Sequence, residues 1–234
     1  MSDRFATTQW SQVIQARDGT ETEVRQALES LCETYWYPLY AYVRHKGNDP
    51  EEAKDLTQAF FTDLISRDFL SNVDPSKGRF RSFLLSAMRN FLSHEWHKSR
   101  AQKRGGGVYT LSMDTDDAER RYKREPVDAL TPEEVYERRW AVTVMQCAMA
   151  RLREESDDTA QFEKLQRFLT SADSAQPYEE VATDLGMSEG AVKTAVHRLR
   201  QRYGRCLRAE ISETVGDDSE VDAEVRHLLQ VAHA

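Results

Sequence analysis

Basic side chains recur along two stretches of the sequence in patterns that suit contact with a polyanion. The first stretch, Lys77–Arg104, mixes lysines and arginines with aromatic, histidine and amide side chains. The second, residues 191–209, carries six lysines and arginines and no acid. Cationic side chains neutralise phosphates, and flat rings stack on unpaired bases. The two stretches therefore indicate nucleic-acid binding at chosen faces, although the net charge of the chain is −8.

The second basic stretch lies in a pattern typical of a helix-turn-helix. Val181, Ala182 and Leu185 form the apolar side of a short helix, and Gly186-Met187-Ser188 predicts a tight turn in which Ser188 caps the next helix. The buried stripe of that helix would consist of Val192, Val196, Leu199 and Tyr203. Its other face would meet the major groove with Glu189, Lys193, Thr194, His197, Arg198, Arg200 and Gln201. The alternative is a plain three-helix domain whose charges only solvate this face.

The first basic stretch contains the clearest helical periodicity in the sequence. Its apolar positions are spaced i, i+3, i+4, i+7 and comprise Phe80, Phe83, Leu84, Ala87, Met88, Phe91 and Leu92. The opposite face holds Arg81 together with the candidate nucleic-acid ligands. Phosphate ligands would be Arg79, Arg89, Lys98, Arg100, Lys103 and Arg104, and base ligands Asn90, His94 and His97. Trp96 fits the core and a ligand contact equally well.

The elements that must position these faces are helices. Scarce glycine (10) and proline (6) favour a mostly helical protein. We expect short helices at 8–17 and 162–169 and a long helix over 21–46. Two further helices would begin at Asp49-Pro50 and at the capping box Thr131-Pro132-Glu133-Glu134. We predict an all-α fold of two small helical domains, residues 1–104 and 132–215. A flexible linker, residues 105–131, would join them and span about 28 Å as a random coil.

The acidic residues 216–234 would form a C-terminal extension. Apolar residues recur there at helical spacing, namely Val221, Val225, Leu228, Leu229 and Ala232. Such a helix would either cover a basic surface of one of the two domains or extend the core of the second domain. The sequence does not decide between these two interpretations.

Other function classes find no support in the sequence. No phosphate-binding loop is present, and His94-Glu95-Trp96-His97 lacks the i, i+4 spacing of a zinc site. Cys32, Cys147 and Cys206 are too far apart for a zinc cluster or a disulfide framework. No membrane span or secretory signal is visible, so we expect a cytoplasmic protein. We therefore predict no catalytic residue, no metal, no cofactor and no enzyme activity.

Four stretches together resemble the extracytoplasmic-function (ECF) group of bacterial RNA polymerase sigma factors. They are Tyr37–Arg44, Asp55–Phe61, Gly78–Leu84 with its continuation through Asn90 to Arg104, and Tyr178–Lys193. The likeness covers about residues 30–104 and 132–210, and is closest to a subgroup with a long linker and a C-terminal extension. It implies a transcription initiation factor that binds the polymerase core, reads the minus-thirty-five element as duplex and reads the minus-ten element as a melted strand.

The resemblance also implies roles for individual residues. The helix that docks on the clamp helices of the largest polymerase subunit would present Asp55, Gln58 and Thr62, although the family's usual acid is Ala59 here. The loop Ser71–Gly78 lies where the family captures a flipped base. The minus-ten strand would be held by Arg79, Arg89, Asn90, His94, His97, Lys98, Arg100, Lys103 and Arg104. The minus-thirty-five element would meet Ser188, Glu189, Lys193, Thr194, His197, Arg198 and Arg200.

Further partners implied are promoter DNA, the flap of the second-largest polymerase subunit, and a regulator such as an anti-sigma factor. Two other functions stay open from the residues alone. One is a helix-turn-helix regulator that does not dock on polymerase, which would leave residues 30–104 unexplained. The other is a helical adaptor without DNA contact, which predicts that substitution of Lys193 or Arg198 leaves DNA retention unchanged.

Overall fold

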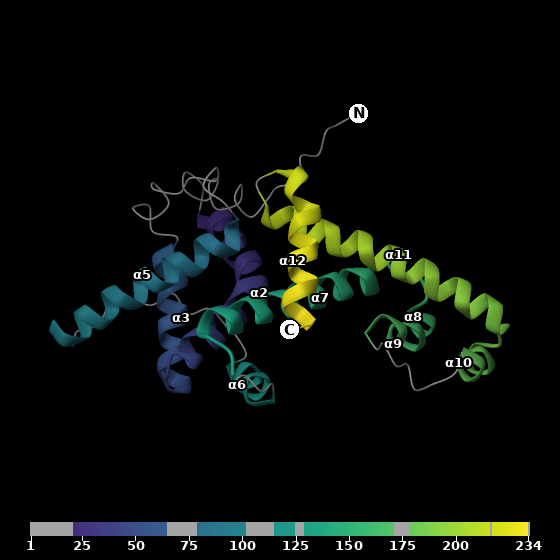
Figure 1. Ribbon diagram of the computed structural model, residues 1–234, viewed down its shortest axis with the longest axis horizontal. Coiled ribbons are helices and arrows are strands. Elements are labelled where there is room, and N and C mark those ends of the chain that lie inside the picture. The colour runs from purple at the N-terminus through teal and green to yellow at the C-terminus, as the bar shows by residue number, and fades with distance from the viewer. Residues whose placement is uncertain are drawn as a thin grey trace. The chain divides into compact units, whose positions relative to one another are not determined.

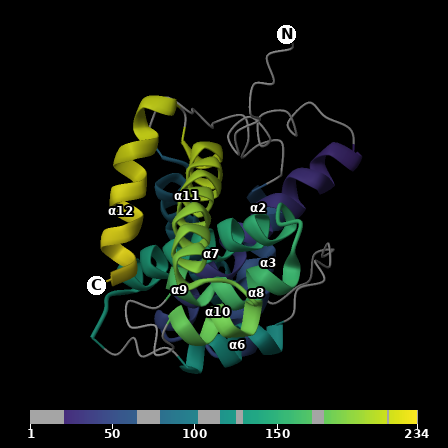
Figure 2. The same ribbon diagram turned by 90° about the vertical axis from the view of Figure 1, so that its right-hand side faces the viewer.

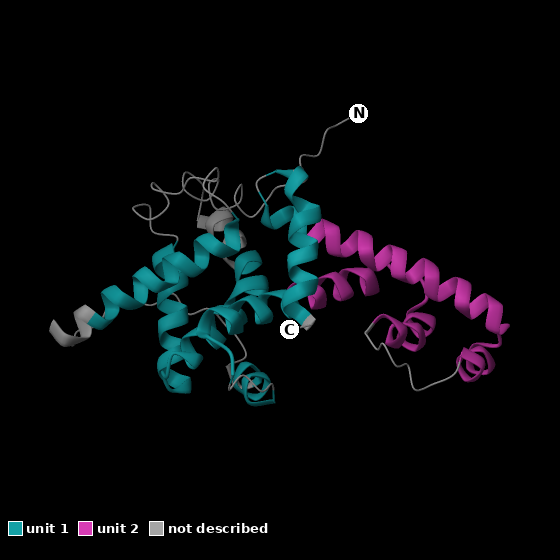
Figure 3. Cartoon of the chain, in the orientation of Figure 1, with its two compact units in different colours: residues 1–143, 211–234 teal, residues 144–210 magenta. Residues whose placement is uncertain are grey.

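The structure is a computed structural model of the full chain, and it describes residues 21–64, 79–101, 115–124, 129–170, 178–215 and 217–233. Every regular element in these ranges is a helix, which confirms the predicted all-α class (Figure 1). Packing divides the chain into two compact units (Figure 3). Unit 1 comprises residues 1–143 and 211–234, and unit 2 comprises residues 144–210. The expected helix at 8–17 lies outside the described residues.

Unit 1 is built on α2 (Glu21–His45), α3 (Pro50–Leu64) and α5 (Phe80–Ala101). The side chain of Asp49 accepts the backbone N–H of Glu52 at 2.8 Å, which caps α3 as predicted. Aromatic rings join the three helices: Tyr35 meets Phe80 edge-on with ring centroids 5.4 Å apart, and Phe60 meets Phe91 at 5.7 Å. These ring contacts hold α5 against α2 and α3.

Residues 115–124, inside the predicted flexible linker, form a helix instead of a coil. This helix, α6 (Thr115–Arg124), has only one fully buried apolar side chain, Ala118, so the apolar periodicity that reveals other helices is missing. It packs on α2 mainly through charge. Glu119 accepts two hydrogen bonds from Arg44, both at 3.0 Å, and one from Tyr40 at 2.6 Å.

Two long helices contribute to both units. Helix α7 (Pro132–Glu154) begins with the predicted capping box, in which the carboxylate of Glu134 accepts from the backbone N–H and hydroxyl of Thr131. Helix α11 (Glu189–Thr214) likewise contributes its last residues to unit 1. The units therefore divide within continuous helices, at 143/144 and 210/211, and the division differs from the predicted domain boundaries.

Unit 2 contains the short helices α8 (Thr159–Leu165), α9 (Arg167–Thr170) and α10 (Tyr178–Leu185), which lie beside the first part of α11 (Figures 1 and 2). Phe162, Leu165 and Phe168 are buried among them. The chain ends with a 3₁₀ turn, η2 (Asp218–Glu220), and α12 (Val221–His233), the yellow helix that runs to the label C in Figure 1. Helix α12 belongs to unit 1.

Candidate nucleic-acid interface

The turn between α10 and α11 has the geometry that the sequence predicts for a helix-turn-helix. Gly186 takes a φ of +64°, a left-handed conformation that residues with a Cβ rarely adopt. The hydroxyl of Ser188 accepts the backbone N–H of Ala191 at 3.2 Å and so caps α11. Val181 and Ala182 of α10 and Val192 and Val196 of α11 are all buried in unit 2. This packing fixes which face of α11 points to solvent.

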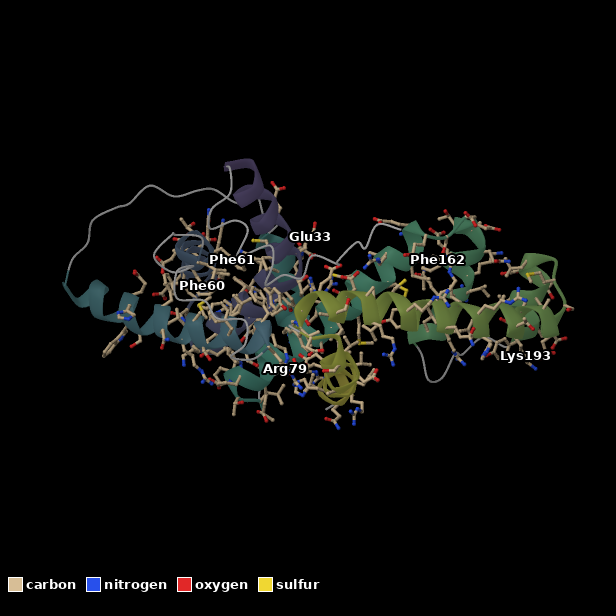
Figure 4. All side chains as sticks on the ribbon, turned by 90° about the horizontal axis from the view of Figure 1, so that it is seen from above. Glu33, Phe60, Phe61, Arg79, Phe162 and Lys193 are labelled. Atoms are coloured by element: carbon tan, nitrogen blue, oxygen red, sulfur yellow. The ribbon has the colours of Figure 1, made fainter. Side chains whose placement is uncertain are left out.

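The exposed face of α11 carries the residues predicted to meet duplex DNA, namely Glu189, Lys193, Thr194, His197 and Arg198. The Lys193 ammonium lies 2.6 Å from the Glu189 carboxylate, and this hydrogen bond raises the pKa of Lys193. Thr194 donates its hydroxyl to the carbonyl of Gly190. Figure 4 shows Lys193 on the outer side of its helix. These side chains form one polar face within the N-terminal half of α11, in which Lys193 and Arg198 are the cations.

Arg200, although predicted for the same face, has a partner inside unit 2. Its Nη2 donates to the carbonyl of Phe168 at 3.1 Å, at the end of α9. Arg202 similarly donates to the carbonyl of Glu155 after α7. Cations at these sites satisfy carbonyls that helix ends leave without intrahelical partners. Their positions therefore fit a structural role in unit 2.

A second polar face runs along α5 in unit 1. Arg89, Asn90 and His94 are exposed there. The Arg89 guanidinium lies 2.8 Å from the carboxylate of Glu133 in the first turn of α7, and this hydrogen bond raises the pKa of Arg89. The backbone of α5 continues through the positions of His97, Lys98 and Arg100, whose side chains are not described, while Lys103, Arg104 and the loop 71–78 lie outside the described residues.

A groove of about 470 Å³ lies beside this face of α5. It is lined from α2, the α2–α3 turn, α3 and α5, by residues that include Tyr42, Asn48, Glu52, Arg89 and Trp96. Trp96 is 56% exposed, so it does not belong to the core, which was one of its two predicted places. An open aromatic ring beside an arginine and an amide is a suitable platform for an unpaired base.

The start of α5 holds a charged cluster that sequence reasoning missed. Arg81, expected on the polar face, is only 5% exposed and pairs with Glu224 of α12 and Glu137 of α7. Arg79, predicted as a phosphate ligand, also pairs with Glu224, its Nη1 lying 2.7 Å from Oε2. The paired residues are 56 to 145 positions apart in the sequence, so no local pattern predicts these ion pairs. The one sequence feature that indicates them is an acid, Glu224, within an apolar helical stripe.

The predicted polymerase-docking residues lie along one side of α3. Asp55 is exposed, and Gln58 and Thr62 are half-buried. The opposite side of the helix buries Ala53, Thr57, Phe60, Phe61 and Leu64 in unit 1. Asp55, Gln58 and Thr62 thus lie on the side of α3 opposite to its buried aromatic residues.

The part of the chain that the structure describes gives little basis for a metal site, a reactive thiol or a membrane span. No group of three or more His, Cys, Asp or Glu side chains could hold a metal ion among these residues. Burial raises the pKa of Cys32 to about 12, so its thiol is protonated at neutral pH. Among the same residues, no helix combines the length and the apolar character that crossing a bilayer requires.

Comparison with protein-family models gives a match over residues 8–209, to a family described as ECF sigma factor. The matched range includes α2 to α10 and most of α11, and ends before α12. Comparisons with curated proteins and with solved structures give no match.

Proposed function

The chain belongs to the ECF sigma factor family, and from this premise we propose that it carries the RNA polymerase core to promoters through three separate surfaces. The face of α11 would read the minus-thirty-five element as duplex. The polar face of α5 would hold the melted minus-ten strand. The outer stripe of α3 would dock on the clamp helices of the largest polymerase subunit. The chain would act in the cytoplasm, with promoter DNA as ligand and without catalysis of its own.

One observation carries this proposal: the N-terminal half of α11 presents Lys193, Thr194, His197 and Arg198 to solvent directly after a capped helix-turn-helix turn. A helix entering the major groove reaches base edges with residues near its N-terminus. Arg and Lys there contact guanine edges or phosphates. Arg200 is removed from the proposed reading face, because its guanidinium is engaged with the carbonyl of Phe168.

The minus-ten surface would use Asn90, His94 and Trp96 for unpaired bases and Arg89 for the backbone. Extruding a base costs a few kcal/mol, which this small surface is not expected to supply alone. Docking on polymerase would provide the remaining free energy and would hold both DNA-binding surfaces on one template. We therefore propose weak DNA binding by the isolated protein and tight promoter binding by the assembled holoenzyme.

The proposed domain boundaries are residues 1–104 for polymerase docking and minus-ten contact and 132–215 for minus-thirty-five contact. Residues 105–131 would connect them, and residues 216–234 would form the extension. Two weak DNA contacts on one chain combine into a higher overall affinity, because the second contact is intramolecular once the first has formed.

The proposal is tested by run-off transcription from fragmented genomic DNA with core polymerase and either the native chain or a variant. We expect Lys193→Ala to lower promoter-dependent product about tenfold, as expected for loss of one specific contact of roughly 1–3 kcal/mol. Arg153→Ala is a matched control, because Arg153 and Lys193 have the same side-chain exposure of 57% and each pairs with one glutamate.

Equal losses for Lys193→Ala and Arg153→Ala would show that α11 does not read DNA. Binding of the variants to core polymerase, measured separately by gel filtration, distinguishes loss of promoter contact from loss of docking.

A further inference from the structure

Glu224 is an acid at a position where helix α12 needs an apolar residue. Val221, Glu224 and Leu228 share one side of α12, and all three are buried in unit 1, with Glu224 fully enclosed. Burying a carboxylate is unfavourable unless cations and hydrogen bonds compensate for its lost hydration. If α12 only extended a hydrophobic core, an apolar side chain at position 224 would be more stabilising than a glutamate. The acid therefore points to a role for its two cationic partners.

Those partners are Arg79 and Arg81 at the start of α5. Arg81 Nε donates to Oε1 of Glu224 at 2.5 Å, whereas Arg79 Nη1 lies 2.7 Å from Oε2 as an ion pair outside hydrogen-bond alignment. Arg81 is held further by an ion pair with Glu137 and by stacking over Trp140, with its Cζ 5.0 Å from the ring centroid. Arg79 lacks these additional partners and keeps a third of its side chain exposed.

The difference between the two arginines suggests which one can change partner. Arg81 has two partners outside α12, because Glu137 and Trp140 both lie on α7. Among the described residues Glu224 is the one ion-pair partner of Arg79, which directly precedes α5, where the minus-ten strand is proposed to bind. Guanidinium groups bind carboxylate and phosphate with similar geometry. A DNA phosphate could therefore occupy the position that the Glu224 carboxylate takes in this structure.

We propose that Arg79 is a phosphate-binding residue of the minus-ten surface and that Glu224 of α12 occupies its site in the free protein. Helix α12 is then an intramolecular competitor of single-stranded DNA. This inference rests on the proposed function, because it requires the strand to run along α5. The acids around it, at positions 217, 218, 220 and 222, add repulsion toward a phosphate backbone while α12 is docked.

The test uses the full chain and a fluorescein-labelled single-stranded dT20 probe, with binding followed by anisotropy between 50 and 200 mM NaCl. We expect Glu224→Gln to bind at least about threefold tighter at 50 mM and to steepen the plot of log K against log salt by about 0.7, the value for one further phosphate on a single strand. Glu224→Asp keeps the charge but shortens the side chain, and is expected to change binding in the same direction.

Glu220→Gln is the matched control, because Glu220 is exposed and the substitution changes the net charge equally. We expect its affinity to stay within twofold of the native chain. Arg79→Ala is expected to abolish the gain of Glu224→Gln, so that the double variant binds the probe no tighter than Arg79→Ala alone. Circular dichroism confirms that each variant is folded, and amide exchange is expected to be faster in α12 of both Glu224 variants.

The proposal is overturned if Glu224→Gln and Glu220→Gln bind the probe equally, or if Arg79→Ala weakens the native chain as much as it weakens Glu224→Gln. Absence of probe binding by every variant is a different result, because it removes the minus-ten surface of the proposed function itself and with it the ligand for which α12 competes.

Discussion

Replacing Glu119 with glutamine tests how helix α6 is held on α2. The carboxylate accepts two hydrogen bonds from Arg44 and one from Tyr40, and its side chain is 14% exposed. The hydrogen bonds from Arg44 lower the pKa of Glu119 to about 2, from an ordinary value of 4.5. A difference of this size corresponds to about 3 kcal/mol before solvent screening is considered. Because the side chains of Arg44 and Glu119 keep 17% and 14% of their surface exposed, solvent screening lowers this value, and we expect about 2 kcal/mol.

The expected result is a melting temperature about 4–8 °C lower for Glu119→Gln, measured by circular dichroism on the full chain. Asp117→Asn is the control, since Asp117 is about half exposed and its ion pair with Arg120 is long, at 3.6 Å. We expect this control to stay within about 0.5 kcal/mol of the native chain. Equal melting temperatures for the two variants would refute the assigned role of Glu119.

The pH dependence gives an independent measure of the same ion pair. The pKa of Glu119 is depressed in the folded state, so its stabilisation is complete above the unfolded value of about 4.5 and is lost as the pH falls towards 2. The native chain should therefore lose more stability between pH 5 and pH 3 than Glu119→Gln does. Parallel pH profiles over this interval would contradict the account.

Three further substitutions test other parts of the structure. Phe60→Ala removes a fully buried ring that meets Phe91, and is expected to cost about 3–5 kcal/mol in a urea melt of the full chain. A loss below about 1 kcal/mol would contradict this packing. Gly186→Ala places a Cβ at a φ of +64°, and is expected to lower the free energy of opening of unit 2 by about 1–2 kcal/mol. Amide exchange in unit 2 measures this, and an unchanged exchange rate would refute it. Trp96→Ala should weaken dT20 binding about tenfold without lowering the melting temperature, since the ring is 56% exposed.

Local chemistry made much of the fold predictable from the sequence. The stripe from Phe80 to Leu92 identified α5, because helical spacing of apolar residues survives any tertiary arrangement. The caps at Asp49, Thr131 and Ser188 marked three helix starts, and each makes the expected hydrogen bond. These signals depend only on residues within four positions of one another.

Features that depend on ion pairs between residues distant in the sequence were not predictable in this way. Helix α6 is attached by Glu119 to residues 75 and 79 positions away, and its composition resembles that of a solvated linker. Arg81 was expected on the polar face but is buried. Its partners Glu137 and Glu224 lie on two other helices, so residues near Arg81 in the sequence do not indicate them. For α12, Glu224 contacts Arg79 and Arg81 at the start of α5, whereas His227 contacts Glu137 of α7, so α12 meets residues that the sequence assigned to both domains.

Run-off transcription with an Asp55→Lys variant tests the central claim most directly. Asp55 is exposed on the outer side of α3, so reversing its charge changes the proposed polymerase contact without touching the aromatic core. Asp157→Lys, an exposed acid in the turn after α7, is the charge-matched control. We predict that core polymerase saturated with the native chain or with Asp157→Lys initiates RNA at specific genomic sites, and that Asp55→Lys lowers this product at least tenfold. No specific initiation by the native chain, or equal initiation by all three proteins, would contradict the account.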